Sequence, residues 1–280
     1  MKGFRHIGRL SLAVSLVVWS FLSSGCAVIN KVIAKDKLNQ GALMFNRGSY
    51  QEAYDFIKRS TELDPSNPNG WLFKGAAIIK LYGNATDDAD RKAKQDEAIA
   101  AYQKALTLSD SLQIEKQKCS VRDNAIGYLA KIYDDKGDES TRREWLLKRT
   151  EGVCAKPDVK AATFYSIGVA YWKCAYDQTQ RYADKQKITS DPFHFRTIYT
   201  PEDKKKHEDC LAKGMEFIEK ALAVKEDYAD ALSYKSLLLR EKQKTTNVEA
   251  ERKKYNDQAE TLAKRVMQLN KEAAAKAPQG

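Results

Sequence analysis

The chain has 280 residues, of which 31% are charged and 42% hydrophobic, and its formal net charge is +10. This composition excludes a protein that crosses the membrane many times and a chain that is disordered for lack of apolar residues. Lys, Glu, Ala, Leu and Gln are abundant and alternating Val and Ile runs are nearly absent after residue 33, which predicts an all-helical fold. The 38 acidic residues are interleaved with the 48 basic ones, so the charge predicts no nucleic acid partner.

Residues 1–25 have the pattern of a secretory signal peptide. Residues 1–9 are basic, and the apolar run at 10–22 is shorter than the roughly 20 residues that a membrane-spanning helix needs. The run leads into the sequence LSSGC at residues 22–26. This sequence resembles the lipobox of bacterial lipoproteins, although Ser23 stands where that motif usually has leucine. The alternatives are an ordinary secretory signal cleaved nearby and an uncleaved anchor.

The lipobox resemblance implies that Cys26 carries fatty acids such as palmitate and becomes the new N-terminus. Ala27 follows it, where aspartate would retain an enterobacterial lipoprotein at the inner membrane. We therefore expect an anchor in the outer membrane, facing the periplasm, and a short lipid-anchored stub at 26–33. The basic residues that anionic headgroups would attract next to the anchor are Lys31, Lys35 and Lys37. A solvated helix face is the simpler explanation of these lysines.

Residues 34–273 repeat with a period of 34 residues, interrupted by insertions. In the first unit, small and apolar residues fill the key places: Gly41, Met44, Gly48, Tyr50, Ala53, Ile57 and Leu63. This pattern resembles the tetratricopeptide repeat (TPR), a helix-turn-helix in which small residues at places 8 and 20 let neighbouring helices approach closely. The predicted fold is an all-α, TPR-type α-solenoid of about five repeats.

The repeat register also predicts where the regular pattern is interrupted. Insertions are expected near 83–93, 176–207 and 243–253, with the longest in repeat four between its two helices. Thr200, followed by proline and two acidic residues, predicts a helix that starts near residue 201. Residues 274–280 are expected to form a flexible tail.

Four cysteines remain if Cys26 is lipidated, which is an even number in an exported chain. They allow three connectivities, and four buried free thiols are the alternative. In the repeat register, Cys174 and Cys210 flank the turn of repeat four, and Cys119 and Cys154 lie at one end of the hairpin of repeat three. The register therefore predicts the disulfides Cys174–Cys210 and Cys119–Cys154.

No motif for catalysis is present in the sequence. It lacks the GxSxG, Walker-type and GxGxxG patterns. His194, His207 and Cys210 are close in sequence but do not have the spacing of a metal site, so no metal or cofactor is expected. The paired acidic residues are explained by ion pairs on solvated helix faces.

The TPR resemblance implies a partner-binding face lined by helix A of each repeat. Together with the aromatic cluster of the long insertion, the candidate residues are Phe45, Leu72, Ile79, Tyr165, Trp172, Phe193, Phe195 and Tyr199. The expected ligand is a helix or an extended peptide in an apolar groove, unless parts of the protein itself fill that groove. We also expect residues 190–199 to pack on the array, because exposed aromatic clusters are costly.

These features predict a non-catalytic, lipid-anchored periplasmic adaptor that binds proteins of a cell-envelope complex. It is similar in plan to the TPR lipoproteins of outer-membrane and pilus assembly. Two other hypotheses stay open: a module that binds cell-wall polysaccharide through Phe193, Phe195 and Tyr199, and an accessory subunit of an envelope enzyme.

Overall fold

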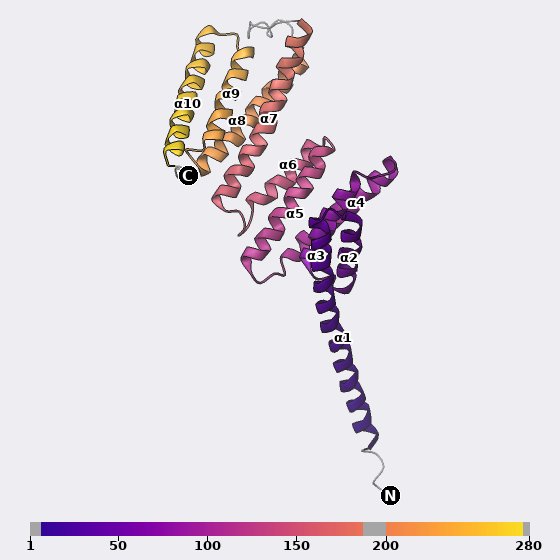
Figure 1. Ribbon diagram of the computed structural model, residues 1–280. Coiled ribbons are helices and arrows are strands. Elements are labelled where there is room, and N and C mark those ends of the chain that lie inside the picture. The colour runs from indigo at the N-terminus through magenta and orange to yellow at the C-terminus, as the bar shows by residue number, and fades with distance from the viewer. Residues whose placement is uncertain (1–6, 187–199, 277–280) are drawn as a thin grey trace. The chain divides into compact units, whose positions relative to one another are not determined.

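The computed structural model describes the backbone of residues 7–186 and 200–276, with side chains from residue 27 to 181 and from 200 to 276. Within these ranges every regular element is a helix. In chain order they are α1 (Ile7–Asn46), α2 (Tyr50–Leu63), α3 (Pro68–Tyr82), α4 (Asp88–Ser109), α5 (Glu115–Asp135), α6 (Glu139–Leu147), the 3-10 helix η1 (Lys148–Thr150), α7 (Pro157–Gln186), α8 (Pro201–Val224), α9 (Ala229–Thr245) and α10 (Glu249–Lys276) (Figure 1). The predicted fold class, an all-α array of TPR-type helix hairpins, is confirmed.

The chain forms two compact units, residues 1–142 and 143–280, and each is described by itself. In the first unit, α1 packs on α2 and α3 packs on α4. In the second, α7 packs on α8 and α9 packs on α10. Among the described residues, no helix combines the length and the hydropathy that a membrane crossing needs.

Glycines at the predicted small-residue places let the helices of each hairpin approach closely. A Cβ on Gly75 of α3 would lie 2.7 Å from the ring of Tyr102 on α4, and a Cβ on Gly168 of α7 would lie 2.7 Å from the side chain of Ile218 on α8. Contacts this short require a neighbour to move. Tyr102 is completely buried and its ring stacks on Tyr128 of α5 at a centroid distance of 4.9 Å, so it has little room to shift.

We expect Gly75→Ala to lower the free energy of unfolding of the first unit by about 1–3 kcal/mol, because the added methyl group overpacks against the fixed Tyr102 ring. Gly127 of α5 is the matched control in the same unit, since a Cβ there would meet no atom within 4 Å. Gly127→Ala should stabilise by about 0.5–1 kcal/mol, because alanine favours a helix more than glycine does. Urea unfolding followed by circular dichroism measures both, and equal effects of the two changes would contradict the packing argument.

The expected insertions are largely built as helix extensions. Residues 176–186, expected between the two helices of repeat four, instead continue α7 as far as Gln186. Residues 88–93 form the first turns of α4, and only residues 246–248 separate α9 from α10. The sequence of residues 176–186 contains no Gly or Pro, so nothing local ends α7 there. The predicted stub 26–33 likewise belongs to α1, and residues 274–276 of the predicted tail belong to α10.

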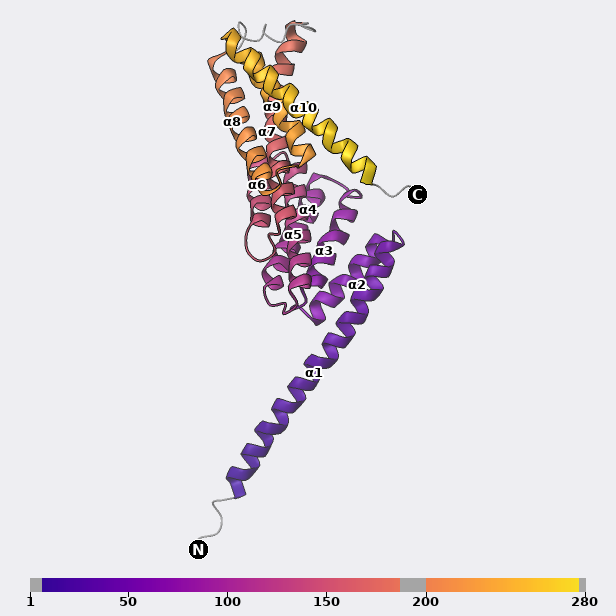
Figure 2. The same cartoon turned by 90° about the vertical axis from the view of Figure 1, so that its left-hand side faces the viewer.

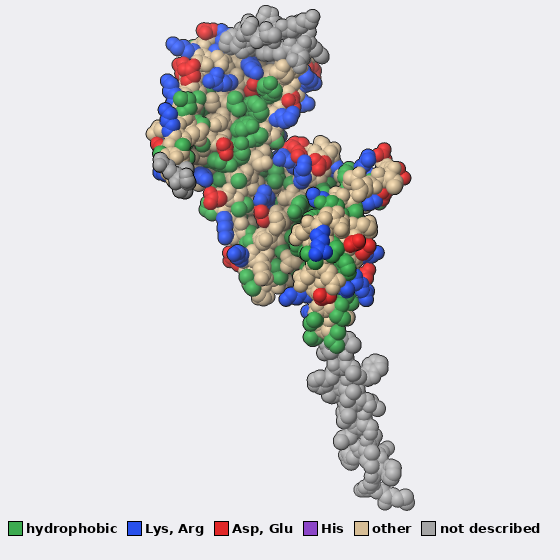
Figure 3. All heavy atoms as spheres, in the orientation of Figure 1, with side chains coloured by type: hydrophobic (Ala, Val, Ile, Leu, Met, Phe, Trp, Pro, Cys, Tyr) green, Lys and Arg blue, Asp and Glu red, His purple; other side chains and the backbone are tan. Residues whose placement is uncertain are grey.

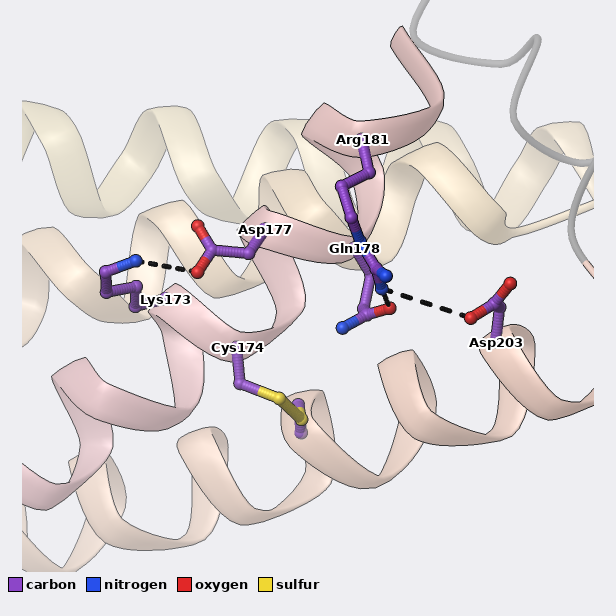
Figure 4. Close-up of a disulfide and its surroundings, with 7 residues drawn as sticks. Lys173, Cys174, Asp177, Gln178, Arg181 and Asp203 are labelled. Atoms are coloured by element: carbon purple, nitrogen blue, oxygen red, sulfur yellow. Dashed lines mark hydrogen bonds and ion pairs between the residues drawn. A yellow bond between two sulfur atoms is a disulfide. The ribbon is translucent and has the colours of Figure 1, made fainter. Parts of the chain in front are cut away.

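The long hairpin of α7 and α8 has a capped start to its second helix and a covalent bond between its helices. α8 begins at Pro201, as the sequence predicts, with the Thr200 side chain accepting a hydrogen bond of 3.1 Å from the backbone N–H of Asp203. A disulfide joins Cys174 to Cys210 with the Cα atoms 5.9 Å apart. Figure 4 shows this bond linking the two helices.

The disulfide lies in the middle of the hairpin, which corrects the predicted place of both cysteines. Cys174 is not the end of the first helix, because α7 continues to Gln186, and Cys210 lies well inside α8. Arg181 and Asp203, each seven residues further toward the tip than the nearest cysteine, form an ion pair at 4.0 Å (Figure 4). The two contacts share one antiparallel register. The bond therefore connects two helix bodies rather than closing the base of a loop.

A small buried polar cluster ties α7 to α9. Thr179 Oγ1 donates a hydrogen bond of 2.9 Å to Glu241 Oε2, and Lys244 Nζ lies 2.6 Å from Glu241 Oε1. Nearby on α8, His207 is completely buried. Burial, with a smaller contribution from the positive charge of Lys244, lowers the pKa of His207 to about 4. This histidine is therefore neutral in the folded protein at neutral pH.

Candidate functional site: an aromatic strip on the second unit

Five aromatic rings form a continuous row between α7 and α9, which we call the aromatic strip. In order along the row they are Tyr228, Tyr165, Tyr234, Trp172 and Tyr176. The centroids of successive rings lie 5.2, 5.5, 5.2 and 5.3 Å apart. These distances lie within the range of favourable aromatic pairs.

The spacing of the residues on the two helices explains the row. Tyr165, Trp172 and Tyr176 follow one another at intervals of seven and four, so they share one side of α7. Tyr234 of α9 packs its ring edge against both Tyr165 and Trp172, and Tyr228 precedes α9 as its N-cap residue. Figure 3 shows a band of apolar side chains over α7 and α9 on this face of the unit.

The strip is partly open to solvent and has a cation near each end. Tyr176 is 36% exposed and Trp172 is half-buried. The ammonium group of Lys244 lies 5.5 Å from the ring of Tyr176, and that of Lys225 lies 5.4 Å from the ring of Tyr228. Burial, with smaller contributions from Tyr234, Asp230 and Tyr228, raises the pKa of Tyr165 to about 12, so its hydroxyl stays protonated at neutral pH.

This arrangement suits recognition rather than proton transfer. Rigid aromatic side chains offer a large contact area at a low cost in conformational entropy, and their hydroxyl groups can exchange hydrogen bonds with a ligand. Within the ranges that the structure describes, no three His, Cys, Asp or Glu side chains are placed to hold a metal ion. The aromatic strip is the candidate binding surface of the second unit.

The predicted partner-binding residues are divided between the two units. Tyr165 and Trp172 both belong to the aromatic strip. Phe45 is half-buried against the small core of Ala53, Ile57 and Ala77 in the first unit. Leu72 and Ile79 are half-buried on α3, so their role in partner binding stays a prediction.

Several sequence predictions fall outside what the structure describes. Phe193, Phe195 and Tyr199 lie outside the described residues, and so does the expected packing of residues 190–199 on the array. The side chain of Cys26 lies outside them too. The pair Cys119–Cys154 would join the two units and stays a prediction. Cys119 does not precede its helix as expected, because α5 already begins at Glu115.

Three of the five rings, Tyr176, Tyr228 and Tyr234, are not predicted from the sequence. Tyr176 falls in the predicted insertion, and Tyr228 lies in the connection before α9. Tyr234 is not at one of the places that usually line the binding face. One signal was available: Trp172 and Tyr176 are four residues apart, so a helix that continued through the predicted insertion would have put them side by side.

Two cavities of about 750 and 600 Å³ lie between α8 and α10, on α9. Both are lined by Met215, Glu219, Lys242 and Tyr255, so they are two parts of one groove. Figure 2 shows α10 running at an angle to α8. It contains Lys235 and Glu219, whose ion pair measures 3.1 Å.

Comparison with known proteins gives matches in structure only. No family model matches the sequence, and no curated protein does. MamA from Desulfovibrio magneticus is 15% identical, covers 85% of this chain and 96% of its own, and has a TM-score of 0.45. YrrB, a TPR protein with an unusual peptide-binding site, is 12% identical over 84% of this chain and 90% of its own, with a TM-score of 0.41. Pseudomonas aeruginosa PilF is 12% identical over 90% of this chain and 95% of its own, also with a TM-score of 0.41. These likenesses are too distant to transfer a function.

Proposed function

We propose that this protein is a non-catalytic adaptor of the bacterial cell envelope, anchored by lipid at Cys26 in the outer membrane and facing the periplasm. It binds protein partners through the aromatic strip. The observation that carries the proposal is the row of five rings between α7 and α9, which is partly exposed to solvent. Aromatic residues of this kind are enriched at the centres of protein interfaces.

Two further features support export and anchoring. The signal pattern and the LSSGC sequence at residues 22–26 have the order expected of a lipoprotein precursor. The Cys174–Cys210 disulfide suits an oxidising compartment such as the periplasm, because thiols in the cytosol are kept reduced.

Photo-crosslinking in living cells tests the binding surface. A photoreactive phenylalanine analogue at position 176 keeps an aromatic ring at the exposed end of the strip. We expect it to capture a defined envelope protein. The same analogue at Lys264, which is exposed on α10 in the same unit, should not capture that protein.

Adding Trp172→Ala to the position-176 protein should weaken capture at least about tenfold, since truncating a central aromatic hot-spot residue costs about 2 kcal/mol or more of binding free energy. Equal capture with and without Trp172 would reject the strip as the binding site. Capture of peptidoglycan fragments instead of a protein would favour the cell-wall hypothesis, because aromatic rings also stack on sugars. Capture of an enzyme would identify this protein as its accessory subunit.

A further inference from the structure

The first turns of the mature chain carry exposed apolar side chains on one side of α1. We call them the N-terminal stripe: Val28, Ile29, Val32 and Ile33. They are 64%, 59%, 66% and 40% exposed, respectively. Figure 3 shows apolar side chains gathered where the described part of α1 begins. Isolated exposed apolar residues are ordinary, but four within two turns on one side form a patch that needs a partner.

The stripe points away from the rest of the first unit. At 100° per residue its four side chains span an arc of about 140°, and Ala34 lies roughly opposite the centre of that arc. Ala34 is completely buried and its carbonyl oxygen accepts a hydrogen bond of 2.7 Å from Ser60 Oγ of α2. Figure 2 shows α1 continuing beyond the end of α2 toward the N-terminus. The other helices of the first unit therefore leave the stripe uncovered.

Charge and position identify what can cover it. Lys31 and Lys35 are exposed and lie along one edge of the stripe, and Asp36 ends it on the C-terminal side. An apolar face with lysines at its margin is the pattern of a helix that lies in the membrane interface. The stripe also lies close to Cys26. It begins two residues after Cys26 and ends seven residues after it, so its far end is about 10 Å from Cys26 along the helix axis. A lipid on Cys26 would hold it at the bilayer surface.

We propose that the N-terminal stripe docks into the surface of the anionic bilayer that holds the Cys26 lipid, so that the part of α1 that carries the stripe lies in the headgroup region. This inference rests on the proposed anchor. A flexible linker would leave the array free to take any orientation. A docked, continuous α1 instead fixes the direction in which the first hairpin leaves the membrane.

Fluorescence quenching in vesicles tests the proposal on the full-length protein processed in cells. An environment-sensitive fluorescent amino acid replaces either Val32, in the stripe, or Lys31, beside it. The vesicles contain phosphatidylglycerol and a lipid that carries a nitroxide quencher in its acyl chain. We expect at least about twofold stronger quenching at position 32 than at position 31, because only the stripe enters the acyl boundary. The double change Ile29→Asp and Ile33→Asp should abolish this difference and leave the helical content unchanged.

Mass spectrometry of the N-terminal peptide reads the lipid on Cys26 separately, so a missing anchor and a missing docked helix are distinguished. If Cys26 carries no lipid, quenching at positions 31 and 32 is measured with phosphatidylglycerol vesicles at a saturating concentration. Stronger quenching at position 32 still supports docking. Equal quenching at the two positions overturns the proposal in either case. Crosslinking between two copies through position 32 would also overturn it, by showing that a second chain covers the stripe.

Discussion

Replacing both cysteines of the long hairpin, with Cys174→Ala and Cys210→Ala, is expected to lower the free energy of unfolding by about 3–4 kcal/mol. The bond joins residues 36 positions apart, and in the chain-entropy model a loop of this length restricts the unfolded state by that amount. Chemical denaturation of the two proteins under non-reducing conditions measures the difference. A double variant as stable as the parent would show that the bond does not constrain the unfolded chain.

Reducing the disulfide in the parent protein is the control for effects of the cysteine substitutions themselves. Dithiothreitol should destabilise the parent protein by at least as much as the double substitution does. If Cys119 and Cys154 are also joined, reduction should further destabilise the double variant. Non-reducing peptide mapping then decides the pairing, and a crossed link such as Cys119 to Cys174 would refute the repeat register on which the prediction depends.

We expect the second large effect when the pH is lowered, which should decrease the free energy of unfolding. His207 has its pKa lowered from 6.5 to about 4 in the folded state, mainly by burial and then by Lys244. Between these two pH values the unfolded chain binds more protons than the folded one. The stability that neutral His207 contributes is therefore fully present above pH 6.5 and is lost as the pH decreases toward 4. At pH 5 this one group should reduce the free energy of unfolding by about 2 kcal/mol relative to pH 7.5.

His207→Gln isolates this contribution, because glutamine is of similar size and does not titrate in this range. Urea unfolding at pH 7.5 and pH 5 is measured for the parent and the variant. We expect the loss of stability on acidification to be about 2 kcal/mol smaller in the variant. Parallel losses in the two proteins would show that other groups cause the acid sensitivity.

Much of the architecture follows from local features of the sequence. The small residues at places 8 and 20 predict close helix contacts, and Gly75 against Tyr102 and Gly168 against Ile218, both at place 8, are such contacts. The start of α8 follows from Thr200 and Pro201, since a capping side chain and a proline act within one turn of the chain. The TPR resemblance also selected Tyr165 and Trp172, because both stand at places that line the binding face of such arrays.

The tertiary structure decided what local signals leave open. Residues 176–186 have no helix-breaking residue, so whether they form a loop or extend α7 depends on packing against α8 and α9, including the buried pair of Thr179 and Glu241. Because α7 is extended, Cys174 and Cys210 lie in the middle of the hairpin rather than at the predicted ends of the helices.

The same applies to the aromatic strip. Tyr228 and Tyr234 are 63 and 69 residues from Tyr165 along the chain, and only the register between α7 and α9 places their rings 5.2 and 5.5 Å from it. Periodicity within one helix determines which residues share a side. It cannot determine which residue of another helix lies opposite, because side-chain packing between the helices sets that register.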